Sequence, residues 1–440
     1  MLSAFASAFR TPDLRKKLLF SFSIIALYRL GASVPTPGVS TKNINQCISV
    51  VNQGATKDLY SLVNLFSGGA LLRLSIFALT IMPYITASII IQLLTVVIPR
   101  FETLRKEGQS GQNKLTQYTR YLTVGLAILQ STGVVALARS GQLFVGCDPN
   151  RYPIITNESI FGLMTMVITM TAGTAVIMWL GELITDRGIG NGMSLLIFTG
   201  IAARIPAEGG ALLRNGGGFV FAMICLLGLA IITAVVFVEQ AQRRIPVQYA
   251  KRMVGRRMYG GTSTYLPLKV NQAGVIPVIF ASSLLYLPQL VASLSSGGAS
   301  TSWWQRFVQN QLVNQGSWVH IAVYFLLIVF FTYFYVSITF NPEERADEMK
   351  KYGGFIPGIR PGRPTSEYLS FVLSRITLPG ALYLAIIAVL PNFFFSFTAG
   401  NNQNFPFGGT AVLIMVGVGL DTVKQVESQL MQRNYEGFLR

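Results

Sequence analysis

Long apolar runs recur along the whole chain and alternate with short polar or basic segments. A helical run of about 20 apolar residues spans a hydrocarbon core of about 30 Å. The pattern predicts ten membrane-spanning helices, with apolar cores near 18–34, 74–98, 121–138, 161–184, 193–205, 219–238, 273–290, 319–338, 376–397 and 409–420. The fifth and tenth runs are short, about 12 residues each, and both follow glycines. We therefore expect an all-α polytopic membrane protein.

The second run has an unusual start. Ser67, Gly68 and Gly69 interrupt the chain, a short apolar turn carrying Arg73 follows, and Pro83 lies inside the run. Paired glycines disfavour helix continuation, and a proline removes one helical hydrogen bond. We predict a short half-helix around 65–74, a bend, and a span kinked at Pro83. A broken start and a positive charge near membrane depth favour a functional segment. The alternative is a kinked, buried span with a re-entrant lead-in.

An internal repeat links the second and seventh runs. Seven positions of the first copy match seven of the second at a constant offset of 194: Leu72, Leu74, Ile76, Pro83, Ile85, Ala87 and Ser88 match Leu266, Leu268, Val270, Pro277, Ile279, Ala281 and Ser282. Five spans separate the copies, so they cross the membrane in opposite directions. This predicts two inverted five-span halves, 1–205 and 219–426, with the working site between them. We expect an external hinge at 206–218 and a cytoplasmic tail at 427–440.

Composition and charge agree with a membrane protein. The chain is 51% hydrophobic and 12% charged, with a mean hydropathy of +0.49, whereas soluble domains carry about 25% charged residues. The net charge is +17. If the N-terminus is cytoplasmic, roughly three quarters of the lysines and arginines fall on the cytoplasmic side, as the positive-inside rule requires. We therefore place both termini in the cytoplasm. The basic start lacks a cleavage site, so no signal peptide is predicted.

The sequence contains no pattern typical of an enzyme. His320 is the only histidine, and it stands alone at the outer edge of the eighth span. Glu182, Asp186 and Arg187 are best interpreted as a helix-end charge set. An ion-coupled carrier or an intramembrane protease needs ionisable groups inside its spans. Apart from Arg29 and Arg73, the span cores lack them, so we predict neither enzyme activity nor a cofactor.

The cysteines exclude two further classes of site. Cys47, Cys147 and Cys225 form no CxxC pair, which argues against a metal cluster or a disulfide scaffold. A single bridge between Cys47 and Cys147 on the outer side remains one option, and two free thiols remain the other.

Two predicted cytoplasmic loops, 240–269 and 341–375, are longer than the topology requires. The second contains Pro357-Gly358-Ile359-Arg360-Pro361-Gly362, a rigid turn that holds Arg360 at a fixed tip. Such a tip suits docking to another protein or to the phosphates of ribosomal RNA. Positive-inside bias alone is the alternative explanation for both loops.

Several long segments resemble the SecY/Sec61-alpha family, the channel subunits of Sec protein translocons. They are FSGGALLRLSIFALTIMPYITASIIIQLL, QRRIPVQYAKR, LPLKVNQAGVIPVIFASS, FNPEERAD, FIPGIRPG, and a GIGNG run preceded by Asp186-Arg187 where relatives have Glu-Arg. The resemblance extends over almost the whole chain, from residue 11 to residue 436, and looks bacterial.

The resemblance implies a role for each of four residue sets. The plug that closes the external funnel would comprise Phe66, Ser67, Gly68, Gly69, Ala70, Leu71, Leu72 and Arg73. The apolar pore ring would comprise Ile81, Ile85, Met193, Ile197, Ile279 and Ile414; many relatives have isoleucine at the position of Met193. The lateral gate would involve Thr86, Ser88, Gln92, Asn271, Gln272 and Leu287. Docking would use Arg243, Arg244, Lys251, Arg252, Arg256, Arg257 and Arg360.

By the same resemblance, the chain would be a protein-conducting channel of the bacterial plasma membrane. It would pass unfolded secretory polypeptides with signal sequences outward and release membrane-protein segments sideways into the lipid bilayer. The expected partners are the membrane subunits SecE and SecG, the SecA ATPase motor and the ribosome. An inverted-repeat secondary transporter is the alternative, but it would need coupling-ion ligands at the midplane. A membrane enzyme would need a Ser/His or Asp/Asp pair, which the spans lack.

Overall fold

The structure is a computed structural model that describes residues 9–51, 68–71, 73–139, 147, 152–156, 159–249, 252–254, 257–259, 263–294, 307–313, 317–397 and 409–437. Each of the ten predicted runs contains a helix. These helices are α2 (Pro12–Ser33), α5 (Met82–Val97), α7 (Gln109–Arg139), α8 (Ile160–Arg187), α9 (Gly192–Ala202), α10 (Ile205–Gln240), α11 (Ile276–Leu294), α13 (Trp318–Thr339), α15 (Arg363–Phe397) and α16 (Gly409–Gly437). Within the described residues, six helices are long and apolar enough to cross a membrane. The fold is therefore mostly helical, as predicted.

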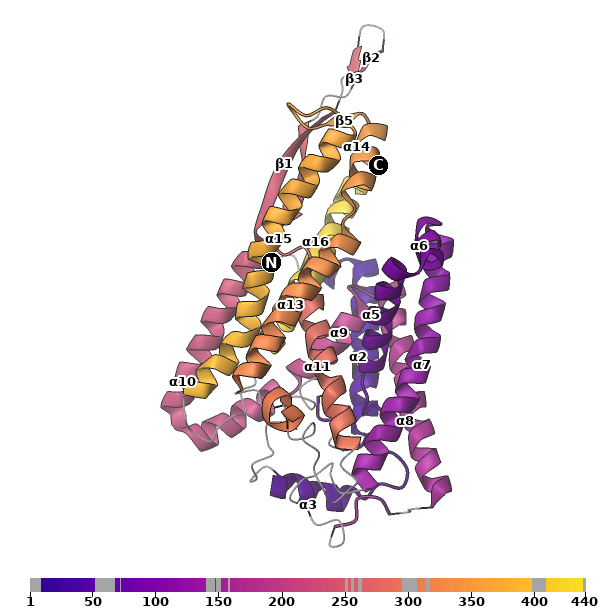
Figure 1. The fold of residues 1–440 in the computed structure, drawn as a ribbon, viewed down its shortest axis with the longest axis vertical. Helices are drawn as coiled ribbons and strands as arrows, with labels where there is room; N and C mark the ends of the chain where they lie inside the picture. Colours follow the sequence, from indigo (N-terminus) through magenta and orange to yellow (C-terminus); the bar gives the residue numbers. More distant parts are fainter. Residues whose placement is uncertain are drawn as a thin grey trace.

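The helices extend between two distinct ends of the molecule (Figure 1). One end carries α6 (Pro99–Lys106), α14 (Pro342–Lys351) and all the strands, and we call it the basic end. The other end carries α3 (Thr41–Val51) and the disulfide between Cys47 and Cys147, and we call it the disulfide end. A short π-helix, Val308–Val313, lies between α11 and α13 in the sequence. The long loops predicted to be cytoplasmic thus share one end.

Those loops contain β-structure that the sequence prediction missed. β1 (Gln242–Tyr249) pairs antiparallel with β4 (Ser263–Lys269) and with β5 (Gly354–Phe355), in the order β4-β1-β5. β2 (Arg252–Val254) and β3 (Arg257–Tyr259) form a separate two-stranded ribbon. In β1, Ile245 and Val247 are buried while their neighbours are exposed. This period of two is typical of a half-buried strand, and both long loops contribute to one sheet.

The predicted kink at Pro83 is wrong. α5 begins at Met82, so Pro83 lies in its first turn. A proline there is well tolerated, because the first helical N–H groups have no partner inside the helix. The predicted half-helix is also wrong for the described residues, since 68–71 and 73–81 form turns; residues 65–67 and 72 lie outside the described part. The sharp bend occurs instead at Ile98, where α5 and α6 meet at 99°.

The inverted repeat is visible in the backbone. α5 begins at Met82 and α11 at Ile276, again 194 positions apart, and each helix has proline as its second residue. Figure 1 shows α5 running toward the basic end and α11 toward the disulfide end. Ala87 and Ala281 are both 0% exposed, and Ile85 and Ile279 are both buried. Matching positions in the two halves therefore have matching environments.

The predicted hinge at 206–218 is helical rather than a loop. It forms the first part of α10, which begins at Ile205 with Pro206 in its first turn. Proline favours helix initiation at that position, and the glycines that follow are individually tolerated within a helix. The predicted tail at 427–440 likewise continues α16 as far as Gly437. Whether 206–218 acts as a hinge stays a prediction.

Candidate functional site

The six positions predicted for the pore ring come together at the centre of the molecule. Ile81 and Ile85 lie at the start of α5, Met193 and Ile197 in α9, Ile279 in α11 and Ile414 in α16. The five isoleucines belong to one hydrophobic cluster and are at most 9% exposed, and the partly buried Met193 packs against that cluster. Helices from both halves thus contribute these residues to one apolar cluster, and their arrangement as a ring around a pore stays a prediction. A narrow waist of this kind can exclude water and ions without a charged filter.

Met193, the departure from the usual isoleucine, lies against a glycine of α8. A Cβ atom added to Gly181 would meet the Met193 sulfur. The glycine leaves the space that the long, flexible methionine side chain occupies. The substitution at the ring therefore depends on a residue in a neighbouring helix, which the sequence pattern did not reveal.

The described part of the predicted plug is packed into the protein. Ala70 and Leu71 are buried, whereas Arg73 is exposed. The Ser75 N–H donates to the Ala70 carbonyl at 3.0 Å, and the Thr36 N–H and hydroxyl both donate to the Leu74 carbonyl. The two bonds from Thr36 attach the segment to the residues that follow α2. Phe66, Ser67 and Leu72 lie outside the described residues.

Gly68 sits where no larger residue fits easily. Its φ of +59° lies in the left-handed region. A Cβ atom added there would be 2.8 Å from a guanidinium nitrogen of Arg29 and 2.9 Å from the Gly200 carbonyl oxygen. Glycine is favoured by both the backbone conformation and the close approach. The plug segment therefore touches α2 through Arg29 and α9 through Gly200, two contacts that sequence reasoning missed.

Two residues of this segment, Leu74 and Thr80, have positive φ values although they are not glycines. Their φ angles are +44° and +53°. Such conformations cost about 1–3 kcal/mol each, and they persist only where the surroundings impose them. Both residues are buried, at 0% and 3% exposure. The segment is thus held by its packing in a conformation that it does not prefer locally.

The predicted gate helices α5 and α11 contact each other. In α5, the Thr86 hydroxyl donates to the Met82 carbonyl, and the Gln92 amide donates to the Ser88 hydroxyl at 3.4 Å. Gln272 is half-buried ahead of α11, and Leu287 lies in α11 with its side chain outside the described part. Two helices of opposite direction therefore contact each other, and the role of the polar residues as a lateral gate stays a prediction.

Asn271 forms a buried pair with a residue that the sequence prediction did not single out. Its amide donates to the Glu239 carboxylate at 2.5 Å and to the Gly274 carbonyl at 3.1 Å. Glu239 lies near the end of α10 and is 8% exposed. The pair connects the end of α10 to the turn that precedes α11. The sequence contains one indication of this pair, which is the acidic Glu239 at the end of an otherwise apolar run.

Buried polar atoms without partners concentrate in the same segments. Among the described residues, the buried side-chain atoms that lack a hydrogen bond are Ser75 Oγ, Gln92 Oε1, Asn271 Oδ1 and Ser283 Oγ. Each buried unsatisfied group costs about 1–3 kcal/mol. One lies beside the predicted plug, one in α5, one directly before α11 and one in α11. Unsatisfied polar groups therefore occur in both proposed gate helices and in the segments that precede them.

The predicted docking residues gather at the basic end. Arg243 and Arg244 lie in β1 and are exposed, and Arg244 stacks on the Tyr265 ring at 4.8 Å. Arg360 is exposed between Gly358 and Gly362, whose φ angles of +84° and +106° fix the turn. The Thr365 hydroxyl donates to the Arg360 carbonyl at 2.9 Å. Arg252 and Arg257 lie in β2 and β3, with side chains that are not described, and Lys251 and Arg256 lie outside the described residues.

Comparison with known proteins identifies relatives along the full length. A family model described as SecY matches residues 75–423. The protein translocase subunit SecY of Mycobacterium tuberculosis strain H37Rv is 68% identical over 444 residues, covering 100% of both chains. The same subunit of Streptomyces coelicolor is 64% identical over 446 residues, again with 100% of both chains covered.

Solved structures share the fold at much lower sequence identity. A protein-conducting channel matches with a TM-score of 0.64 and 17% identity, over 94% of this chain and 91% of that chain. Sec61 in a canine ribosome–channel complex from the endoplasmic reticulum matches with a TM-score of 0.58 and 16% identity, over the same shares of the two chains.

Proposed function

The chain belongs to the SecY family of protein translocase subunits, and we propose that polypeptides cross the membrane through its apolar ring. The observation that supports this proposal is that Ile81, Ile85, Ile197, Ile279 and Ile414, drawn from both halves, share one buried apolar cluster, with Met193 packed against it. Family membership makes the chain a protein-conducting channel and sets the secondary transporter aside. We further propose that it is not an enzyme and needs no cofactor of its own.

The ring suits an extended polypeptide as a substrate. An unfolded chain has no fixed charge or shape, so a charged filter would hinder some segments and hold others. Apolar side chains can part around any sequence and close again, and the closed waist excludes ions by dewetting. On this proposal the segment 65–74, whose Gly68 lies close to Arg29 and Gly200, covers the ring at the disulfide end when no substrate is present.

We propose that the seam between α5 and α11 is the lateral gate. About 18 apolar residues at roughly −0.3 to −0.6 kcal/mol each gain about 5–11 kcal/mol by leaving the channel for lipid. The contact between α5 and α11, which run in opposite directions, supports this assignment.

We propose that the basic end faces the cytoplasm and that the chain is a multi-pass protein of the bacterial plasma membrane with both termini inside. Two features support this orientation. The long basic loops share one end, in accord with the positive-inside rule. The Cys47–Cys147 disulfide lies at the opposite end, which suits an oxidising exterior.

The proposed partners follow from this orientation. SecE and SecG would be the membrane subunits, and the SecA motor or the ribosome would dock on the β2–β3 ribbon and the Arg360 turn. The exposed Arg360 at the tip of its turn supports the proposal. A solved relative of the fold is described as Sec61 in a ribosome–channel complex, and another as an Ssh1 complex bound to a ribosome. Unfolded secretory and membrane proteins with signal sequences would be the substrates.

Photo-crosslinking tests the ring directly. A photoreactive amino acid at Ile85 or Ile279 should capture a stalled secretory chain during ATP-driven export. The same group at Leu226, which is 71% exposed on α10, serves as the control and should capture lipid or other subunits instead. Capture of the chain at Leu226 but not at the two ring positions would place the path elsewhere and remove the proposal.

A further inference from the structure

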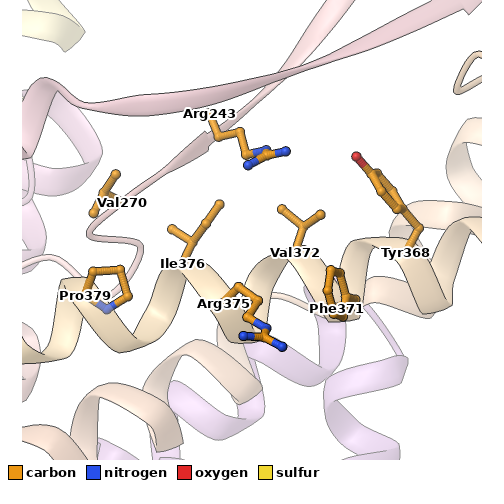
Figure 2. Close-up of a pocket in the computed structure, with 8 residues that line it drawn as sticks. All are labelled: Arg243, Val270, Tyr368, Phe371, Val372, Arg375, Ile376 and Pro379. Atoms are coloured by element: carbon orange, nitrogen blue, oxygen red, sulfur yellow. The ribbon is translucent and has the colours of Figure 1, made fainter.

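A hydrogen bond joins the two halves of the chain at the basic end. The Arg105 guanidinium group in α6 donates to the Ile338 carbonyl in the last turn of α13. α6 belongs to the N-terminal half and α13 to the C-terminal half. Another arginine at this end behaves differently: Arg375 stacks over the Phe371 ring at 5.4 Å, and Figure 2 shows both side chains on α15. The Arg105 bond therefore differs in kind, because it connects elements of opposite halves.

The end of α13 lacks a cation of its own. Its last turn, which ends at Thr339, contains no basic residue. The last four carbonyl groups of a helix have no partner within that helix, and together they carry a partial negative charge. A guanidinium group at this position supplies both a hydrogen-bond donor and a favourable charge. Arg105 thus provides from the N-terminal half what α13 does not contain.

Arg105 is fixed to the first of the two proposed gate helices. α6 follows α5 directly after the bend at Ile98. Leu104 of α6 shares one buried apolar cluster with Ile91 of α5 and Leu115 of α7. Since Leu104 precedes Arg105 in the same short helix, the position of Arg105 depends on the position of α5.

Ile338 is fixed in the same way to the second proposed gate helix. The Phe280 ring of α11 meets the Phe331 and Tyr335 rings of α13 edge-on, with centroid distances of 5.8 and 6.3 Å. α13 therefore packs closely on α11. Because Arg105 is fixed to α5 and Ile338 to α11, the bond crosses from one gate helix to the other. Parting these helices moves Arg105 away from Ile338.

A second attraction acts between the same elements. The hydrogen bond with Glu102 raises the pKa of Lys106, and the Glu344 carboxylate in α14 raises it further. Glu344 lies in the first turn of α14, which begins three residues after α13 ends. The basic last turn of α6 therefore lies near both the carbonyl end of α13 and the acidic start of α14.

We propose that Arg105 is a positioning residue that holds the lateral gate closed at the basic end and makes gate opening depend on the signal sequence. The inference rests on the proposed gate between α5 and α11. Arg105 is exposed, so its bond biases the gate without locking it. A segment with a long apolar core gains more free energy by moving toward lipid than a segment with an interrupted core. The bias therefore acts most strongly against the weaker segment.

Export into vesicles that contain the complete channel complex tests this proposal. One substrate carries an intact signal sequence, and in the other a single charged residue interrupts the apolar core. Arg105→Met should raise export of the interrupted substrate about three-fold, as expected when a helix end loses one cation, and leave the intact substrate unchanged. Arg105→Lys keeps a cation and should behave like the wild type. Arg100→Met removes the same charge from the first turn of α6 and should change neither rate. Wild-type selectivity in Arg105→Met would overturn the proposal.

A distance measurement separates control of the gate from a general loss of stability. Spin labels at Thr103 in α6 and Ser337 in α13, both exposed, report the separation of the two helices in the resting complex. Cys225 is replaced by serine so that it takes no label. Arg105→Met should add a population at longer distance, and Arg100→Met should not. An unchanged distance in Arg105→Met would overturn the proposal, even if export changed.

The outcome can be distinguished from a failure of the proposed gate itself. A short covalent bridge between α5 and α11 tests the gate without involving Arg105. If that bridge blocks export while Arg105→Met behaves like the wild type in both assays, the gate assignment is supported and the role of Arg105 is wrong.

Discussion

Two segments lead into the proposed gate helices, and they differ although the helix starts match. The segment before α5, residues 73–81, is a series of turns, and most of it is buried in the protein. The segment before α11 is β4, a strand that extends from the sheet at the basic end, followed by the turn with Asn271. Both then enter a helix whose second residue is proline.

The inverted arrangement explains how one helix start can serve two purposes. Because α5 and α11 run in opposite directions, the segment before α5 begins nearer the disulfide end and the segment before α11 nearer the basic end. On the proposed function, the first would cover the pore ring and the second would belong to the side on which a motor or a ribosome docks. The repeated part, from the proline to Ala87 and Ala281, stays buried in both copies. The two copies therefore match in the buried helix starts and differ in the segments that lead into them.

The largest expected effect comes from a covalent bridge that joins α5 to α11. A short covalent bridge between a cysteine in 86–92 and one in 272–287, at a pair in contact, should abolish both export and membrane insertion. The exposed Cys225 is first replaced by serine so that it cannot form other bridges. A long flexible spacer at the same pair should restore activity, which is measured as protected substrate in vesicles. Full activity with the short bridge closed would show that the lateral opening lies elsewhere.

A charge reversal at the Arg360 turn should reduce protein export without raising the ion conductance of the resting channel. Arg360→Glu reverses a charge at the exposed turn and should reduce ATP-driven export roughly tenfold, because like charges oppose binding of the motor. Ion conductance of the resting channel should stay at the wild-type level. Lys351→Glu in α14 makes the same change of charge at an exposed site nearby and should have little effect. Normal export by the Arg360 variant would exclude this turn from docking.

Glycine substitutions in the proposed pore ring should have equal effects on ion conductance, whether the residue lies in the N-terminal or the C-terminal half. Ile85→Gly and Ile279→Gly each widen the apolar waist, so each should raise resting ion conductance roughly several-fold, because a wider constriction stays wet. Planar bilayer recordings measure the effect. Ile128→Gly, at an exposed position of α7, controls for the loss of helix stability caused by glycine. A leak from only one of the two ring variants would contradict the matched roles of α5 and α11.

The smallest expected effect concerns Gly68, where the proposed plug approaches Arg29 and Gly200. Gly68→Ala and Gly69→Ala both place a side chain at positive φ, which costs about 1–2 kcal/mol. Only Gly68 also meets Arg29 and Gly200, since an added Cβ at Gly69 has no neighbour within 4 Å. Gly68→Ala should therefore lower the thermal midpoint further than Gly69→Ala and cause a slight ion leak. Equal thermal midpoints and equal ion leak in the two variants would mean that the close approach of Gly68 to Arg29 and Gly200 adds no stability beyond the effect of backbone strain.

The sequence predicted the features that depend on length and local pattern. Apolar runs of sufficient length gave the ten helices, and the 194-residue offset predicted the matched starts of α5 and α11. The place of Pro83 was less certain from sequence, because a proline suits a first helical turn and a kink equally well. Sequence could not decide between them, since the segment before Met82 is held by bonds to the residues that follow α2: the Thr36 N–H donates to the Leu74 carbonyl, and the Ile76 N–H donates to the Val34 carbonyl.

Contacts between distant residues were beyond local reasoning. Glu239 and Asn271 are 32 residues apart and belong to different elements, so neither identifies the other. Gly68 was recognised as a helix breaker, but its approach to Gly200 appears only in three dimensions. The alternation of Ile245 and Val247 was readable as a strand, yet the surrounding arginines favoured the interpretation as a basic loop. Tertiary packing supplied what these patterns left open.

The disulfide has a consequence for how the protein is made. Cys47 and Cys147 are 100 residues apart, and between them lie the proposed plug, α5, α6 and α7. On the proposed orientation, the two thiols meet in an oxidising compartment only after α7 has crossed the membrane. A nascent chain in which that crossing failed would retain a reduced Cys147 on the cytoplasmic side. The oxidation state of this pair is therefore a biochemical record of correct biogenesis, and once closed it confines the plug segment within a covalent ring.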